Sequence, residues 1–142
     1  MPVLDTDILS IIQARREPQY SRIVRRLNAL PLGTPVYVTI VSFEEQLRGW
    51  LEYVKRATVD QLPNAYAALG ALNRDYNTRA VLPFDDRAAL RLKQLQAARS
   101  RIGAMDLRIA AITLANSQML ISANLKDFRR VPGLAVEDWS AT

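Results

Sequence analysis

Five short apolar runs alternate with longer stretches of helical periodicity, and this alternation limits the possible folds more than any other feature of the chain. The runs occupy residues 3–4, 36–41, 80–82, 119–122 and 134–136. Strands that alternate with helices imply crossover connections, and these produce a parallel sheet with helices on both faces. The sequence therefore predicts an α/β domain.

The stretches between these runs repeat apolar residues at helical spacing. The expected helices are a first over residues 8–12 that stops before Pro18, a second over 20–27, a third from Ser42 to Val54, a fourth over 62–72, a fifth capped by Asp85 or Asp86, and a sixth over 106–116. The sixth is apolar nearly all round, so we expect it to be deeply buried.

The length of 142 residues is typical of one domain, and we expect a single domain over residues 1–142. No apolar stretch approaches the ~20 residues of a membrane span, and the N-terminus lacks the basic and then apolar regions of a secretory signal. These features predict a cytoplasmic protein without a membrane partner.

The composition restricts the chemistry that the chain can perform. It contains no cysteine and no histidine, which excludes disulfides, thiol catalysis, imidazole bases and zinc sites built on those residues. The formal charge is +5, and 16 of the 19 basic residues are arginine. Because the guanidinium group matches phosphate, this balance weakly favours a nucleic-acid partner, although a solvated basic face would explain it equally well.

Oxygen-bearing side chains follow several of the predicted strands. They are Asp5 after the first run, Glu44 and Glu45 after the second, Asp106 at the start of the sixth helix, and Asn124 and Asp127 after the run 119–122. The carboxyl ends of parallel strands meet at one edge of a sheet, where ligand sites form. We therefore expect these side chains to converge.

Each acid also has a purely structural explanation. Ser42 and Glu45 fit a capping box, and Asp106 would serve as a helix cap or as a first-turn acid. Asp127 would pair with a basic neighbour, which is Lys126, Arg129 or Arg130. For any one acid the structural explanation is favoured, but four segments that deliver oxygens to one edge favour a functional site.

Carboxylates crowded within ~6 Å repel one another and need cations or protons between them at neutral pH. Without histidine or cysteine, hard oxygen ligands select Mg²⁺ or Mn²⁺. One such ion, or a pair about 3.5–4 Å apart, activates water and stabilises the leaving oxygen in phosphodiester cleavage. The sequence therefore predicts a metal-dependent nuclease.

Four segments resemble the motif blocks of PIN-domain proteins, and more narrowly those of VapC-type ribonuclease toxins. They are VLDTDILS at 3–10, TIVSFEEQLRG at 39–49, IGAMDLRIAA at 102–111 and LISANLKDFRRVPGL at 120–134. The first block alone is a weak match, whereas the last two together are quite specific. The resemblance extends in the right order from residue 3 to Trp139.

The resemblance implies roles for individual residues. Asp5 and Asp106 would be direct metal ligands. In the second block the family acid lies four residues before a glycine, and Gly49 therefore selects Glu45 over Glu44 as the acid of this block and a further metal ligand, whereas Asp106 is the third acidic residue.

The fourth family position is Asn124, where many members have aspartate. This departure weakens the case for a second metal ion, although Asp127 would be able to supply the missing carboxylate. Thr6 would help to orient Asp5 or a metal-bound water.

The resemblance also implies a three-layer fold, with a five-stranded parallel sheet flanked by helices. The implied activity is RNA cleavage with Mg²⁺, or with Mn²⁺ in its place. The implied partners are the RNA substrate, a cognate antitoxin protein and a second copy of the chain in a homodimer. A cluster of apolar side chains would form either a partner surface or part of the core: Trp50, Leu51, Tyr53, Tyr66 and Leu69.

Two other functions deserve comparison. An aspartate pair after an apolar strand also begins the haloacid-dehalogenase phosphatases, with Asp5 as nucleophile and Asp7 as general acid, but Leu9 stands where that motif has threonine or valine. A PIN-like module that binds RNA or protein without cutting is the stronger alternative. In the nuclease reading Asp7 lies in the first helical turn, where a capping or dipole role is sufficient.

Overall fold

The computed structural model describes residues 1–98 and 101–141 and confirms the predicted α/β class. Its five-stranded sheet is parallel throughout, with the order β3-β2-β1-β4-β5. The strands are β1 (Pro2–Leu4), β2 (Tyr37–Thr39), β3 (Ala80–Leu82), β4 (Met119–Ile121) and β5 (Val136–Glu137). The first strand is thus the central one, and Asp5 follows it directly.

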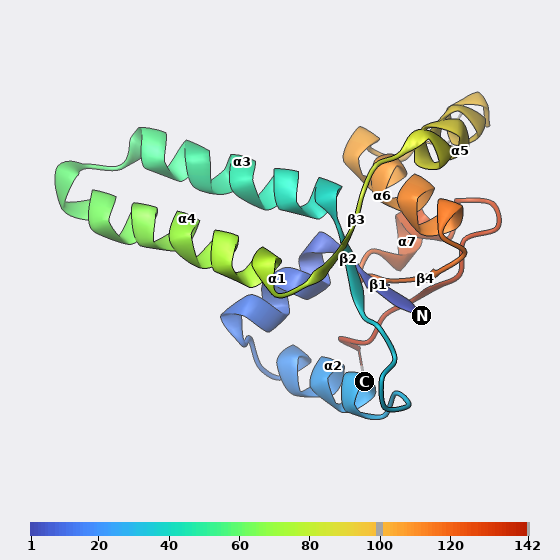
Figure 1. Cartoon of the computed structure of the whole chain (residues 1–142), viewed down its shortest axis with the longest axis horizontal. Helices are drawn as coiled ribbons and strands as arrows, with labels where there is room; N and C mark the ends of the chain where they lie inside the picture. The colour runs from blue at the N-terminus through green and yellow to red at the C-terminus, as the bar shows by residue number, and fades with distance from the viewer. Residues whose placement is uncertain (99–100, 142) are drawn as a thin grey trace.

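Helices cover both faces of the sheet, which gives the predicted three layers (Figure 1). The helices are α1 (Thr6–Ala14), α2 (Gln19–Asn28), α3 (Ile40–Arg56), the 3₁₀ turn η1 (Val59–Gln61), α4 (Leu62–Asn77), α5 (Asp86–Ala97), α6 (Ala104–Ala115) and α7 (Leu125–Phe128). Residues of α1, α2 and α4 pack on one face, and residues of α5, α6 and α7 pack on the other.

The strand side chains alternate between the two cores, as the two-residue period of a strand requires. Val3 and Leu120 belong to the cluster beneath α5 and α6, whereas Leu4 and Ile121 belong to the cluster beneath α1 and α2. These four side chains are at most 1% exposed. A sheet buried on both faces explains why the strand runs are apolar at consecutive positions.

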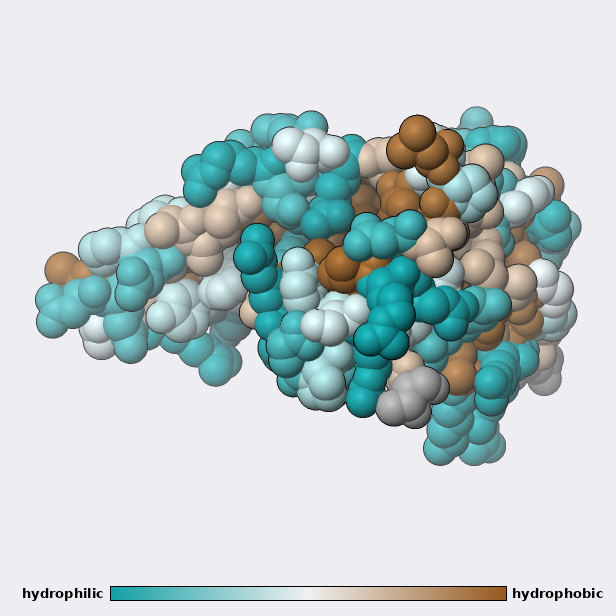
Figure 2. All heavy atoms as spheres, turned by 90° about the horizontal axis from the view of Figure 1, so that it is seen from below, coloured by the Kyte–Doolittle hydropathy of each residue, from teal (hydrophilic) through white to brown (hydrophobic). Residues whose placement is uncertain are grey.

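The helices α3 and α4 form a hairpin that extends away from the sheet (Figure 1). Seen from below, the hairpin stands out from the body of the molecule with a largely polar surface (Figure 2). The fourth helix continues to Asn77, beyond the predicted end at residue 72. Four of the aromatic and apolar residues expected at a partner surface or in the core are exposed on this hairpin, namely Trp50, Leu51, Tyr53 and Tyr66. A core position is therefore wrong for these four.

Two helix starts differ from the prediction. The third helix begins at Ile40 because the Thr39 side chain accepts the Ser42 N–H at 3.1 Å and caps it. The predicted capping box between Ser42 and Glu45 is therefore wrong. The sixth helix begins at Ala104 rather than at Asp106, so Asp106 is a first-turn acid and not the cap.

In the part of the chain that the structure describes, no helix is both long enough and apolar enough to span a bilayer.

Candidate active site

Asp5 lies at the carboxyl end of the central strand and forms the N-cap of α1. Its Oδ1 accepts the Thr6 N–H at 2.8 Å, and its Oδ2 accepts the Ser122 hydroxyl at 2.8 Å. The side chain is only 5% exposed. Ser122 is at the end of the neighbouring strand, so two strand ends hold this carboxylate in place.

Glu45 is held from the opposite side by hydroxyl groups. Thr6 Oγ1 lies 2.7 Å from Glu45 Oε1 and 2.9 Å from Ser42 Oγ, and Thr39 Oγ1 lies 3.4 Å from Ser42 Oγ. A hydroxyl has a single proton and a carboxylate is the strongest acceptor present, so Thr6 donates to Glu45 and accepts from Ser42. Ser42 and Thr39 are fully buried. The three hydroxyls thus form a chain that ends on Glu45.

The adjacent Glu44 points elsewhere. Its Oε2 pairs with Arg48 Nη2 at 2.7 Å, one helical turn along α3. Glu45 and not Glu44 is therefore the acid of α3 that contacts Thr6, the residue that follows Asp5.

The third acidic segment comes from α6 and α7. Asn124 Nδ2 donates to Asp127 Oδ2 at 3.0 Å and lies 3.4 Å from Asp106 Oδ2. No ion pair among the described residues involves Asp127, so its expected pairing with Lys126, Arg129 or Arg130 is wrong. The amide of Asn124 instead links the two carboxylates.

Asp7 makes structural contacts in the same region. Its Oδ1 accepts the Ile8 N–H at 2.7 Å, and its Oδ2 accepts the Ala123 N–H at 3.1 Å. The side chain therefore ties the first turn of α1 to the loop after β4, while the N-cap of α1 is Asp5 and not Asp7.

The charges of these acids raise one another's pKa values. Burial, followed by the Asp7 charge and more weakly by the Asp106 charge, raises the pKa of Asp5 to about 8. Burial raises the pKa of Asp106, with further contributions from the charges of Glu45, Asp127 and Asp7. Neighbouring carboxylates repel one another in their charged form, and a cation between them removes this repulsion. The electrostatics thus favour a positively charged ligand at this edge.

A divalent cation fits this edge by donor type and charge. As the side chains stand, the described residues contain no group of three acidic side chains already close enough to hold a metal ion. Glu45 and Asp106 are both partly exposed, and Thr6, which directly follows Asp5, holds Glu45 by a hydrogen bond. Their hard carboxylate oxygens are the ligands that Mg²⁺ and Mn²⁺ prefer.

A groove of about 810 Å³ lies between α1, α3 and α4, and none of Asp5, Glu45 and Asp106 lines it. Its lining includes Arg16, Gly49, Trp50 and Tyr53. The rings of Trp50 and Tyr53 meet edge to face, with centroids 5.9 Å apart. The groove therefore has an aromatic wall that solvent reaches.

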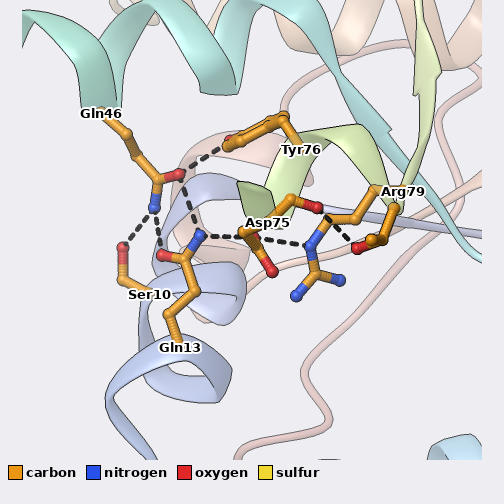
Figure 3. A network of polar contacts seen from close by, with 7 residues as sticks. Ser10, Gln13, Gln46, Asp75, Tyr76 and Arg79 are labelled. Atoms are coloured by element: carbon orange, nitrogen blue, oxygen red, sulfur yellow. Dashed lines mark hydrogen bonds and ion pairs between the residues drawn. The ribbon is translucent and has the colours of Figure 1, made fainter. Parts of the chain in front are cut away.

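The floor of this groove is a polar network that joins the same three helices (Figure 3). Gln46 exchanges amide hydrogen bonds with Gln13 and accepts the Tyr76 hydroxyl at 2.7 Å. Gln13 donates to Asp75 at 2.9 Å, and Asp75 also accepts from Arg79 at 2.8 Å. Gln46 directly follows Glu45, so the network fixes the rotation of α3 that presents Glu45 to the site.

The sequence did not reveal the supporting residues Ser42, Thr39 and Ser122 as members of the site. Thr39 ends β2 and Ser122 follows β4, whereas Ser42 lies in the first turn of α3.

Comparison with known proteins gives a consistent result. The family model described as "PIN domain" matches residues 3–134. The tRNA(fMet)-specific endonuclease VapC of Salmonella typhimurium (strain LT2) is 33% identical over 63 residues, which are 42% of this chain and 48% of that protein. The match thus spans about half the length of this curated relative.

Solved structures resemble the chain over nearly its whole length. VapBC2 from Rickettsia felis, bound to a promoter DNA fragment, has a TM-score of 0.75 at 19% identity and covers 97% of this chain and 98% of its own. VapBC-1 from nontypeable Haemophilus influenzae has a TM-score of 0.75 at 22% identity, with coverage of 99% and 98%. DNA-bound VapBC from Salmonella typhimurium has a TM-score of 0.74 at 25% identity and covers 97% of both chains. These structures share the fold described above.

Proposed function

The chain belongs to the PIN-domain family, and from this premise we propose that it is a metal-dependent endoribonuclease and the toxin of a toxin–antitoxin pair. The observation that supports the proposal is the link between Asp5, Glu45 and Asp106 at the carboxyl edge of the sheet: Thr6, next to Asp5, hydrogen-bonds Glu45, and the Glu45 charge acts on Asp106. They come from three separate segments, and burial and mutual repulsion raise the pKa values of Asp5 and Asp106. The Salmonella relative, described as a tRNA(fMet)-specific endonuclease, supports the nuclease assignment.

Asp5, Glu45 and Asp106 would hold Mg²⁺ or Mn²⁺. When bound, such an ion lowers the pKa of water and neutralises charge that develops on a phosphate. The chain's own contribution is preorganisation: Ser122 holds Asp5 by a hydrogen bond, and Thr6 holds Glu45. Groups fixed in this way need no reorganisation when the substrate arrives.

The RNA backbone would be held by basic side chains near the acids. Arg108 and Lys126 are exposed, and they stand on the helices that carry Asp106 and Asp127. Neither takes part in an ion pair among residues 1–98 and 101–141. Lys126→Gln should weaken RNA binding and reduce the slope of log binding constant against log salt by about 0.7, as expected for one lost phosphate contact on a single strand.

Cleavage by the purified, antitoxin-free protein tests the proposal. RNA should be cut with Mg²⁺ and left intact with EDTA, and Asp5→Ala and Asp106→Ala should lose the activity. Glu52→Ala is the matched control, because Glu52 is an exposed acid on the same helix that pairs with Arg56 and lines neither hollow. Undiminished cleavage by either aspartate variant would refute the site. Binding of RNA without any cleavage would instead favour the non-cutting module.

We also propose that the groove between α1, α3 and α4 receives a segment of the cognate antitoxin. The similar solved structures are described as VapBC complexes, and the exposed Trp50 and Tyr53 offer an aromatic wall for a partner chain. Tyr53→Ala should weaken the complex with the co-expressed antitoxin at least tenfold and spare RNA cleavage. Tyr66→Ala, which changes an exposed tyrosine outside the groove lining, is the control. Equal loss in both variants would contradict the assignment.

A second apolar patch is proposed as the homodimer contact. Ile40 and Phe84 are exposed beside a hollow of about 490 Å³ that Leu92 also lines. Exposed apolar patches of this kind mark interaction surfaces. Analytical ultracentrifugation should give the mass of a dimer for the wild type and of a monomer for Phe84→Glu. A monomeric wild type would contradict the proposed homodimer.

A further inference from the structure

The Asn124 side chain occupies a central place among the acids of the site. Its Nδ2 lies 3.0 Å from Asp127 Oδ2 and 3.4 Å from Asp106 Oδ2. Its backbone N–H donates at 2.9 Å to Ser122 Oγ, the same hydroxyl that donates to Asp5. Asn124 is therefore fixed at both its main chain and its side chain.

The orientation of this amide follows from its neighbours. Two carboxylates face it, and only the NH₂ end of an amide can donate to them. Its two N–H groups therefore point at carboxylate oxygens of Asp106 and Asp127. A cation between these two residues would need the same oxygens. The amide brings partial positive charge to this place without a metal ion.

The remaining acids divide into two groups. Both Asp7 oxygens accept hydrogen bonds from backbone N–H groups, and Asp127 accepts one from the side-chain amide of Asn124. Glu45 and Asp106 are partly exposed, and of these two only Asp106 contacts the Asn124 amide. Three carboxylates can satisfy one divalent cation that keeps some of its water, whereas a pair of ions about 3.5–4 Å apart needs further bridging oxygens.

We propose that the Asn124 amide takes the place of a second cation, so that the site binds a single divalent ion. This inference rests on the proposed metal-dependent function. It assigns Asn124 as a positioning residue that links Asp106 to Asp127, and not as a metal ligand.

Metal stoichiometry tests the inference without reference to cleavage. In titrations of the metal-free protein with Mn²⁺, followed by calorimetry and by the spin-resonance signal of free Mn²⁺, the wild type should bind one ion. Asn124→Asp should bind two, because it replaces the donor with a carboxylate. Asn64→Asp adds the same charge on the exposed first turn of α4 and should still bind one.

A second pair of variants keeps the test independent of how Asn124→Asp folds. Asp127→Asn should change the affinity for the single ion by less than threefold, whereas Asp106→Asn should lower it more than tenfold. Two ions in the wild type, or one ion in a folded Asn124→Asp variant, would overturn the inference and leave the proposed function intact. No ion bound by the wild type would overturn the proposed metal site itself.

Discussion

Replacing Asp5 with asparagine should stabilise the metal-free protein at neutral pH while it abolishes cleavage. The side chain is 5% exposed, and burial, followed by the Asp7 charge, raises its pKa from 3.8 to about 8. Between these two values the folded protein keeps a proton that the unfolded chain releases. Stability therefore falls as the pH rises from about 4 to about 8, because the folded pKa lies above the unfolded one.

The magnitude follows from the two pKa values. From pH 3.8 to pH 7 the linkage amounts to roughly 4 kcal/mol, at about 1.4 kcal/mol per pH unit. The asparagine oxygen can still accept the Thr6 N–H, but the Ser122 hydroxyl loses its carboxylate acceptor, which costs about 1–2 kcal/mol. The expected net gain is therefore about 2 kcal/mol at pH 7.

Urea unfolding in EDTA at pH 7 and at pH 4.5 measures this gain. It should be present at pH 7 and vanish at pH 4.5, and Mg²⁺ should stabilise the wild type but not Asp5→Asn. Asp75→Asn is the control of opposite sign. Burial alone would raise the pKa of Asp75, but hydrogen bonds from Arg79 and Gln13 outweigh it and hold the pKa below its ordinary value. This control should lose stability at pH 7. An Asp5→Asn protein less stable than the wild type at pH 7, or a gain of equal size at pH 4.5, would refute the reasoning.

Three other substitutions test the surroundings of the site. Ser42→Ala breaks the hydroxyl chain and should lower stability by about 1 kcal/mol; the rate of cleavage should fall about tenfold at unchanged RNA affinity because Glu45 is less well placed, and an unchanged rate would count against the chain. Gly49→Ala should raise the free energy of unfolding by about 0.5–1 kcal/mol, since an added Cβ meets nothing within 4 Å. A lower free energy of unfolding in a urea titration would contradict this prediction. Asp7→Asn should retain most of the RNA cleavage, since both Asp7 oxygens accept backbone N–H groups; a variant as inactive as Asp5→Asn would return attention to a phosphatase with two catalytic aspartates.

The arrangement of strands was predictable because burial on both faces leaves a strong local signal. The apolar runs at 3–4, 80–82 and 119–122 lie in β1, β3 and β4 to within one residue. Their alternation with helices was enough to place Asp5, Glu45 and Asp106 at one edge. The limits of the third helix were less predictable, because Ile40 and Val41 suit a strand as well as a helix; the Thr39 cap decides between the two.

The supporting contacts of the site were not predictable from local pattern. Thr6 and Ser42 are separated by 36 residues, and Ser122 and Asp5 by 117. A serine at the end of a strand has the same local sequence whether it faces a carboxylate or solvent. Likewise, the periodicity of α3 and α4 predicts two helices but not that they extend together beyond the sheet.

The pairing of β1 with β4 has a consequence for the synthesis of the protein. The strand made first finds one of its two neighbours more than a hundred residues later, with Val3 in register with Leu120. Contacts so distant in sequence form late, because the intervening chain must be closed into a loop before they are gained. A translation product that stops before β4 lacks the Ser122 hydroxyl and Asn124, and its central strand is open on one side. Prematurely terminated copies of the chain should therefore be harmless to the RNA of the cell that makes them.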